Sequence, residues 1–308
     1  MATLLSVIIP VYNEEGNIKM AFQKIDHILK NADIRYELLF INDGSQDTTW
    51  DKINEMVTEN KNIRGLCFSR NFGKEAAIFA GLEYSKGDCC VVIDCDLQHP
   101  PEKIVDMYRL WEAGYEVVEA RKKSRGDESI FHSLAAKCFY SIISKGMKID
   151  MSRASDFKLL DRKAVMALVN MKEQNVFFRA LSSWIGFKTA QVEFDVQDRM
   201  VGESKWSTIQ LIKYAIANIS AFSAAPMQLV TFLGIFMLGG SIILGIMALY
   251  DKLTGVAPEG FTTVLIIQLF MGSIIMISLG IIGYYISKIY EETKRRPRYI
   301  VTEICKEK

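Results

Sequence analysis

Residues 88–98 read DCCVVIDCDLQ, an apolar run followed by two aspartates with one residue between them. The run is short and bounded by polar residues, so we expect a buried strand of a parallel sheet over Asp88–Ile93. Three more segments share this character, namely Leu4–Pro10, Tyr36–Ile41 and Arg64–Phe68. The chain therefore opens with a sheet built largely from buried strands.

Amphipathic stretches separate these strands and predict helices over Asn17–Lys30, Asp47–Asn60 and Gly73–Ser85. Strands and helices alternate along the chain, which is typical of an α/β fold with a mostly parallel, doubly wound, Rossmann-like sheet. Ligands of such sheets bind beyond the carboxyl ends of the strands. Functional residues are therefore expected at that edge.

Polar clusters follow three of the expected strands, at Tyr12–Glu14, Asn42–Ser45 and Asp94–Asp96. A ligand that carries a diphosphate is a polyanion, and a divalent cation held by carboxylates would neutralise its charge. Asp94 and Asp96 suit this task, because a chain that leaves the pleat can turn both side chains toward one ligand. An Asp-x-Asp triplet alone is common by chance. Its position after an apolar strand makes it a specific indication of a Mg²⁺ or Mn²⁺ site.

The composition excludes one class of partner and indicates a compartment. The 308 residues carry a net charge of +1, whereas nucleic-acid binding usually needs a concentrated basic face, so we expect no nucleic-acid partner. The six cysteines form no CxxC pair and fit reduced thiols. The N-terminus has no basic segment followed by an apolar one, so we expect no secretory signal. The first half of the chain is therefore expected in the cytosol.

The part that follows is more helical. Apolar residues recur at helical spacing in Ile130–Gly146 and again in Ser207–Ser223. Both stretches can be ordinary core helices. The second runs directly into an apolar region, so an amphipathic helix in the membrane interface over residues 207–226 is the sharper interpretation.

Two stretches are long enough to cross a bilayer, Met227–Tyr250 and about Thr263–Tyr290, because a transmembrane helix needs ~20 residues. A buried hairpin of a soluble protein is the alternative, but little else in the chain could cover so much apolar surface. The loop between them, Asp251–Thr262, has a single lysine, and the tail is basic over residues 294–298. The positive-inside rule then places the tail in the cytosol.

The chain is thus expected to be an integral protein of the cytoplasmic membrane with three parts. These are a cytosolic catalytic domain over residues 1–206, an interfacial helix over 207–226, and two transmembrane helices (about 227–250 and 263–290) with a basic cytosolic tail within 227–308. Small residues in the apolar stretches fit close packing between copies of the chain, in a homo-oligomer, as well as they fit ordinary membrane composition.

Several short motifs give the chain a specific resemblance. They are Val7–Glu15, Ile41–Asp47, Ser69–Lys74, Asp94–Gln98, Ser155–Phe157 and Gly202–Lys205. With these motifs the chain resembles the family 2 glycosyltransferases of GT-A fold, and especially the polyprenyl-phosphate branch. That branch includes dolichyl-phosphate mannose synthases and bacterial undecaprenyl-phosphate glucosyltransferases. The resemblance covers nearly the whole chain, and the paired apolar stretches match the bacterial members.

The resemblance implies the reaction. A hexose would pass with inversion from a nucleotide sugar, expected to be UDP-glucose, to polyprenyl (undecaprenyl) phosphate. The product would be a polyprenyl-phosphate sugar for modification of cell-envelope glycans. UDP-N-acetylglucosamine is the alternative donor, because the two sugars differ at one substituent whose pocket the sequence does not place.

The resemblance also assigns residues. The nucleotide pocket would be lined by Pro10, Tyr12, Glu14, Asp43 and Asp94. Asp96 would be the principal metal ligand, with Asp94 and Gln98 beside it. Asp156 would be a catalytic carboxylate near the acceptor.

Two positions depart from the pattern of the relatives. Asn42 stands where many of them have an aspartate, and His99 stands where an aspartate often precedes the two prolines. A metal-ligating histidine and an ordinary loop histidine are both open interpretations of His99, and the ordinary one is the more frequent.

The acceptor's own charge shapes the expected mechanism. A phosphate monoester has a second pKa of ~6, so it is already largely dianionic at neutral pH and needs little help from a base. Cations should gather around it, and the candidates are Arg121, Arg125, Arg199 and Lys205. A solvated surface loop is the alternative for the basic run that contains Arg121. Asp156 would then chiefly orient these cations or the acceptor oxygen, so Asp96, Asp156 and Arg121 are the expected catalytic residues.

Two other functions compete with this one. A processive polysaccharide synthase would usually carry a Gln-x-x-Arg-Trp motif and more apolar spans, and the chain has neither. A non-catalytic membrane scaffold would have no reason to keep Asp94, Asp96 and Asp156 together. Labelled sugar recovered in the lipid phase would separate the three functions.

Overall fold

The computed structural model describes residues 3–122, 155–171, 173, 177–195, 225–254 and 260–305. The chain divides into two compact units. The first is Met1–Leu211 with Arg296–Lys308, and the second is Ile212–Arg295. The helices expected over Ile130–Gly146 and Ser207–Ser223 lie outside the described residues.

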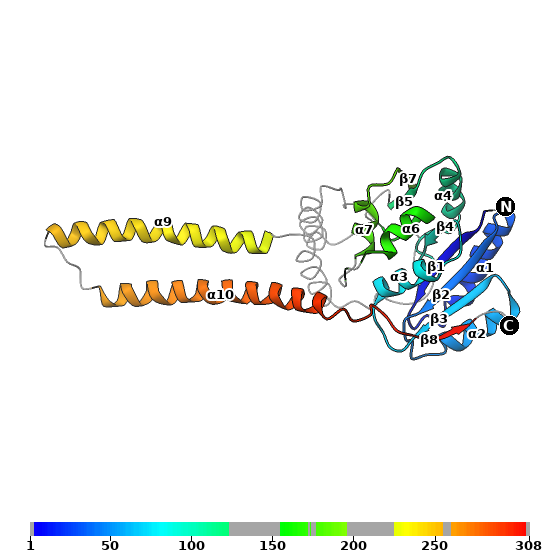
Figure 1. The fold of residues 1–308 in the computed structure, drawn as a ribbon, viewed down its shortest axis with the longest axis horizontal. Helices are drawn as coiled ribbons and strands as arrows, with labels where there is room; N and C mark the ends of the chain where they lie inside the picture. The colour runs from blue at the N-terminus through cyan, green and yellow to red at the C-terminus, as the bar shows by residue number, and fades with distance from the viewer. Residues whose placement is uncertain are drawn as a thin grey trace. The chain divides into compact units, whose positions relative to one another are not determined.

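The first unit is built on a sheet of eight strands in the order β7-β5-β6-β4-β1-β2-β3-β8 (Figure 1). The strands are β1 Leu5–Val11, β2 Tyr36–Asn42, β3 Ile63–Phe68, β4 Cys89–Val92, β5 Val117–Lys122, β6 Lys158–Asp161, β7 Thr189–Phe194 and β8 Val301–Cys305. The helices of this unit are α1 Ile18–Asn31, α2 Thr49–Glu59, α3 Lys74–Tyr84, α4 Lys103–Glu112, α6 Arg162–Val169 and α7 Phe178–Trp184. The expected α/β fold is confirmed.

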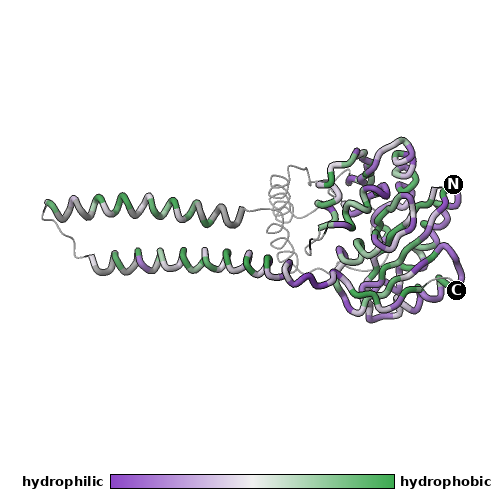
Figure 2. Tube along the Cα trace, in the orientation of Figure 1, coloured by the Kyte–Doolittle hydropathy of each residue, from purple (hydrophilic) through white to green (hydrophobic). Residues whose placement is uncertain are grey.

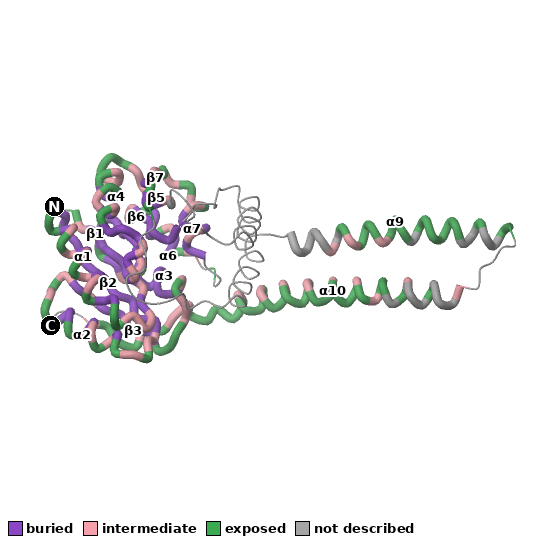
Figure 3. Tube along the Cα trace, turned by 180° about the vertical axis from the view of Figure 1, so that it is seen from behind, coloured by how far each residue is buried: buried purple, intermediate pink, exposed green. Residues whose placement is uncertain are grey.

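The four expected strands and three expected helices all appear within two residues of their predicted bounds. The centre of the sheet is parallel, since β1 pairs with β2 and β4, and β2 pairs with β3. These central strands are buried along most of their length (Figure 3). Burial on both faces explains why their sequences are continuously apolar rather than alternating.

Helices cover both faces of this sheet. On one face, the inward residues of β1 (Leu5, Val7 and Ile9) share a core with residues of α1, α2 and α4. On the other face α3 packs so tightly that a Cβ on Gly81 would lie 2.2 Å from Cγ2 of Ile8. The sheet is therefore doubly wound, and α3 is held against β1.

Two antiparallel strands were not predicted from the sequence. β6 lies between β4 and β5 and is antiparallel to both. β8, from the C-terminal tail, adds antiparallel to β3 at the edge of the sheet. Tyr299 stacks on Phe68 with ring centroids 5.0 Å apart, and the Ser69 amide donates to the Ile300 carbonyl over 3.0 Å. The tail from Arg296 thus belongs to the first unit.

The second unit contains two long helices, α9 (Ala225–Thr254) and α10 (Phe261–Thr293), which contact each other. Both are largely apolar (Figure 2), and large side chains such as Phe236 and Met276 are mostly exposed. Among the described residues, Phe270–Thr293 is long and apolar enough to cross a membrane, whereas Phe232–Met247 is a shorter apolar stretch. The two expected spans are therefore not confirmed as a pair.

Candidate active site

The carboxyl ends of β1, β2 and β4 meet at one edge of the sheet. Val11 is paired with Asn42, and Ile8 with Val92, so the chain leaves these neighbouring parallel strands on the same side. The three polar clusters follow these strand ends. The prediction that β1, β2 and β4 deliver acidic residues to one edge of the sheet is confirmed. Glu14, Asp94 and Asp96 all raise the pKa of the Cys95 thiol, after a larger effect of burial.

Asp43 is tied to the loop that leads into α3. Its Oδ1 accepts from the Phe72 amide at 2.7 Å, and its Oδ2 accepts from the Gly73 amide at 2.9 Å. Burial raises the pKa of Asp43, and these two amides oppose that rise. At Gly44, where φ is +65°, a Cβ would lie 2.4 Å from the Arg70 carbonyl carbon, so only glycine lets the two loops approach.

The loop after β1 is locked to the loop after β2. The Asn13 amide donates to Ser45 Oγ at 2.9 Å, and Asn13 Oδ1 accepts from the Gln46 amide at 2.8 Å. Glu14 accepts from Asn17 Nδ2 at 2.6 Å. Pro10 lies within β1, and Tyr12 follows the strand half-buried. The residues expected to line the nucleotide pocket thus come from adjacent loops, while their contact with a nucleotide stays a prediction.

Asp94 and Asp96 follow β4 but have different partners. Asp94 forms an ion pair with Lys74, whose Nζ lies 2.6 Å from Asp94 Oδ1. Asp96 Oδ1 accepts a hydrogen bond from the backbone N–H of Gln98 at 3.1 Å. Burial would raise the pKa of Asp94, but the Lys74 ammonium outweighs it and holds that pKa low, so the carboxyl is ionised at neutral pH.

Asp94, Asp96 and the side-chain oxygen of Gln98 fit a hard divalent cation, because carboxylate and amide oxygens are the ligands that Mg²⁺ takes. The part of the chain that the structure describes brings no three His, Cys, Asp or Glu side chains into one metal-binding group. Mg²⁺ sites on substrate phosphates typically combine one or two carboxylates with phosphate oxygens and water. The metal role of Asp94, Asp96 and Gln98 stays a prediction.

Asp156 is held by two cations that the sequence did not single out for it. Arg179 Nε lies 3.1 Å from Asp156 Oδ1, and a terminal nitrogen of Arg179 lies 2.9 Å from Oδ2. Lys74 Nζ lies 3.1 Å from the same Oδ2. Burial opposes ionisation, but Arg179 and then Lys74 hold the pKa of Asp156 far below its usual range. Asp156 is therefore a poor base at neutral pH.

Lys74 joins the two acidic groups. It opens α3, and its single ammonium contacts both Asp94 and Asp156. Burial lowers the pKa of Lys74, but the two carboxylates outweigh that effect and raise it. Lys74 ends the Ser69–Lys74 motif, so the sequence did contain a signal for it. Arg179 lies in no motif that the sequence analysis identified.

Arg121 lies on β5 beside a buried ion pair. Its Nε is 3.0 Å from Glu119 Oε2, and Lys158 Nζ is 3.1 Å from the other oxygen of Glu119. Lys158 is fully buried and also contacts the Arg179 carbonyl at 3.2 Å. Arg121 thus lies within a strand and is held by Glu119, so it is not part of a solvated loop. The other expected acceptor cations, Arg125, Arg199 and Lys205, lie outside the described residues.

Glu75 adds a titratable group next to this network. Its Oε2 accepts from the Phe178 amide at 2.8 Å. Burial, and then repulsion from Asp156, raise the pKa of Glu75 to about 7. Glu75 therefore stays partly protonated at neutral pH, which limits the negative charge around Asp156.

His99 is a packed residue rather than an exposed loop residue. It is 8% exposed, and its ring lies 5.3 Å from that of Phe157 and 5.4 Å from that of Phe194. Burial lowers the pKa of His99, although Asp94 opposes this, so the ring is neutral at neutral pH. Its Nδ1 is 3.7 Å from Asp94 Oδ2. His99 thus lies in the loop after β4, as the ordinary interpretation expects, with its side chain buried between two aromatic rings. Its alternative role as a metal ligand stays untested.

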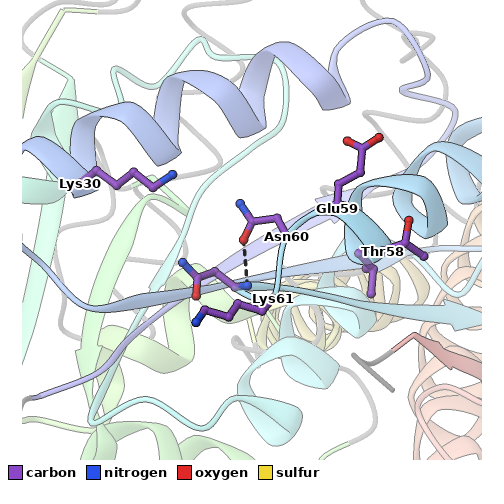
Figure 4. Close-up of a pocket in the computed structure, with 7 residues that line it drawn as sticks. Lys30, Thr58, Glu59, Asn60 and Lys61 are labelled. Atoms are coloured by element: carbon purple, nitrogen blue, oxygen red, sulfur yellow. Dashed lines mark hydrogen bonds between the residues drawn. The ribbon is translucent and has the colours of Figure 1, made fainter.

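A surface hollow of about 500 Å³ lies elsewhere on this unit (Figure 4). It is lined by Lys30 at the end of α1 and by residues 57–62 between α2 and β3. These residues lie at the amino end of the sheet, opposite to the acidic edge. Ligands of doubly wound sheets bind at the carboxyl ends, so we assign the reaction to the acidic edge.

Comparison with known proteins identifies the family of the chain. Residues 6–172 match the family model described as glycosyl transferase family 2. The chain is 40% identical to the "uncharacterized glycosyltransferase YkcC" of Bacillus subtilis, over 96% of this chain and 92% of the relative. It is 35% identical to the "prophage bactoprenol glucosyl transferase homolog" of Escherichia coli, over 98% and 99%. It is 34% identical to the "bactoprenol glucosyl transferase" of Shigella phage SfV, over 96% and 97%.

Solved structures agree on the fold. Glucosyl-3-phosphoglycerate synthase from Mycobacterium tuberculosis, crystallised with Mn²⁺ and UDP-glucose, superposes with a TM-score of 0.50 at 16% identity. The match covers 70% of this chain and 76% of that one. The expected GT-A fold of the catalytic unit is confirmed.

Proposed function

The chain belongs to glycosyltransferase family 2, and from that premise we propose that it transfers glucose from UDP-glucose to polyprenyl phosphate. The observation that carries this proposal is the length of the similarity. Relatives named as bactoprenol glucosyl transferases match over nearly their whole chains, so the match extends through the apolar C-terminal helices as well as the catalytic unit. Those helices suit an enzyme whose acceptor is a lipid.

The donor would bind at the acidic edge. We assign Pro10, Tyr12, Glu14, Asp43 and Asp94 to the nucleotide pocket, and Asp94, Asp96 and Gln98 to the ligands of Mg²⁺ or Mn²⁺. When bound, the cation would neutralise the diphosphate as it leaves. Asp43 supports this pocket through the Phe72 and Gly73 amides, which fix the loop beside it. These contacts support a donor pocket formed by the loops at the carboxyl edge of the sheet.

The acceptor would bind next to Asp156. Its phosphate is dianionic at neutral pH and needs cations rather than a base. Arg121 is the cation we assign to it from the described residues, with Arg125, Arg199 and Lys205 as further candidates. Asp156 is ionised but already held by Arg179 and Lys74, so we propose that it orients the acceptor side rather than removing a proton. The donor and acceptor would meet where Lys74 links Asp94 and Asp156.

The apolar helices would hold the catalytic unit at the membrane. We propose that α9 and α10 both cross the cytoplasmic membrane, and that residues 207–226 lie in its interface. The catalytic unit and tail would then face the cytosol, where nucleotide sugars are made. β8 supports this topology, because the tail after α10 pairs with β3 and so lies on the side of the catalytic sheet.

A donor screen tests this function. Purified full-length protein would be incubated with undecaprenyl phosphate and either UDP-glucose or UDP-N-acetylglucosamine, and the lipid product would be identified by mass. We expect one added hexose with UDP-glucose. A product with N-acetylglucosamine alone would change the donor, and the absence of a lipid product with every common donor would favour the scaffold.

A further inference from the structure

Lys74 lies between the donor-side and acceptor-side carboxylates. Its Nζ is 2.6 and 2.9 Å from the two oxygens of Asp94 and 3.1 Å from Asp156 Oδ2. The backbone before it is anchored, because the Gly73 amide donates to Asp43. The base of the Lys74 side chain is therefore fixed while its ammonium reaches both halves of the site.

The two partners of Lys74 differ in how much they depend on it. Asp156 is 11% exposed and has two hydrogen bonds from Arg179, so its charge is compensated without Lys74. Asp94 is 24% exposed, and Lys74 itself is 40% exposed. The Lys74 side chain is thus more exposed than either carboxylate that it contacts. This exposure leaves Lys74 free to change its partner.

The proposed donor site favours such a change. A divalent cation on Asp94 and the ammonium now on both oxygens of Asp94 carry like charges and share the same oxygens. A carboxylate has about four lone-pair sites, so the two cations compete for Asp94 through their repulsion and their shared oxygens. Binding of donor and cation would therefore weaken the contact of the ammonium with Asp94, and Asp156 is the partner that it already contacts.

We propose that Lys74 is a positioning residue that exchanges partners during the reaction. It holds Asp94 while the donor is absent. Once the donor is bound, Lys74 leaves Asp94 and stays hydrogen-bonded to Asp156. The N–H group that had contacted Asp94 then donates to an oxygen of the acceptor phosphate. An ammonium has three N–H groups, so it can hold Asp156 and the phosphate together. This inference rests on the proposed function, because it assumes a metal-bound donor and a phosphate acceptor.

Binding of Mn²⁺ without nucleotide tests the first half of the exchange. Free Mn²⁺ is measured by electron paramagnetic resonance during titration of the full-length protein, Lys74→Met and Lys74→Arg. We expect Lys74→Met to bind Mn²⁺ roughly fivefold or more tightly, the low end for coupled sites, because a competing cation is gone. Lys74→Arg keeps the competitor and should bind as the wild type does. Equal or weaker Mn²⁺ binding by Lys74→Met would overturn the exchange.

Transfer kinetics test the second half. Lys74→Met should lower kcat and raise KM for undecaprenyl phosphate, each by roughly tenfold or more, a typical cost of losing a charged hydrogen bond. KM for UDP-glucose should stay within a factor of about two, and Lys74→Arg should recover part of the loss. Lys30→Met, at the opposite end of the sheet, is the matched control. A Lys74→Met effect confined to KM for UDP-glucose would contradict the acceptor role.

The two proposals fail in different ways. If the wild type made no lipid-linked sugar from any donor, the proposed function would be refuted. The Mn²⁺ titration would still measure whether Lys74 competes with the metal ion for Asp94. If Lys74→Met does not fold, Lys74→Gln replaces it and keeps a polar contact to Asp156. Wild-type transfer by the folded variant, at unchanged KM for the acceptor, overturns the proposal.

Discussion

The donor edge and the acceptor side of the site hold their carboxylates in different ways. At the donor edge, Asp43 is bound by the amides of a neighbouring loop, and Asp96 by an amide two residues away. On the acceptor side, Asp156 is bound by the charged side chains of Lys74 and Arg179. Asp94 belongs to both kinds, because it lies at the donor edge and is paired with Lys74. Backbone amides leave the charges of Asp43 and Asp96 available for a cation, whereas Arg179 and Lys74 largely cancel the charge of Asp156. Asp96 is therefore suited to a metal, and the surroundings of Asp156 to an anion.

The sharpest test of this difference is Asp96→Asn. The change keeps the size of the side chain but removes one of the charges that we assign to the cation. We expect transfer to fall by about 10²–10³-fold even with saturating Mg²⁺ or Mn²⁺, as measured by labelled sugar in the lipid phase. Asp106→Asn, on exposed α4, is the matched control and should transfer normally. Near-normal transfer by Asp96→Asn would refute the donor-edge assignment.

Asp156→Asn should have a smaller effect of a different kind. The low pKa of Asp156 means that it is ionised throughout the neutral range, so its loss removes an orienting group rather than a proton acceptor. We expect kcat to fall by about 10- to 100-fold, less than the loss of a strong general base, with an unchanged pH dependence. The pH–rate profiles of wild type and variant measure this. Loss of an acidic limb in the variant's profile would restore Asp156 as a base.

Asp43→Asn tests a carboxylate that is held by backbone amides. Asparagine keeps one acceptor oxygen and cannot serve both the Phe72 and Gly73 amides, so we expect a loss of about 1.5–3 kcal/mol in the free energy of unfolding. KM for UDP-glucose should rise several-fold because the loop before α3 loosens. Urea unfolding and steady-state kinetics measure the two effects. Asp51→Asn, on the exposed face of α2, should change neither value.

Glu75→Gln should have the smallest effect on transfer. Folding raises the pKa of Glu75 from 4.5 to about 7, so the folded protein binds more protons than the unfolded chain between these values. This contribution to stability is present below about pH 4.5 and is lost as the pH rises toward 7. We expect Glu75→Gln to flatten the pH dependence of unfolding in that window. An unchanged slope would mean that Glu75 is ionised in the folded protein.

The same difference explains how far the sequence predicts the molecule. The central strands are marked by continuous apolar runs, and the acidic clusters by the turns that follow them, so both signals lie within a few residues. The pairing of Asp156 with Lys74 joins positions 82 residues apart, and no local pattern specifies it. β8 escaped prediction because its residues, which are exposed or half-buried, gain their strand partner only when the tail reaches β3. The burial of the His99 side chain could not be predicted, because its aromatic neighbours are Phe157, just before β6, and Phe194 at the end of β7.

The central claim is that the donor edge and the acceptor side together carry out one direct displacement. The anomeric configuration of the lipid product tests this claim most directly. In-line attack by the acceptor phosphate on an α-linked nucleotide sugar inverts the anomeric centre. Nuclear magnetic resonance of the product made from UDP-glucose and undecaprenyl phosphate should therefore show a β-linked glucosyl phosphate. An α-linked product would contradict a single displacement between the Asp94–Asp96 edge and the Asp156 side.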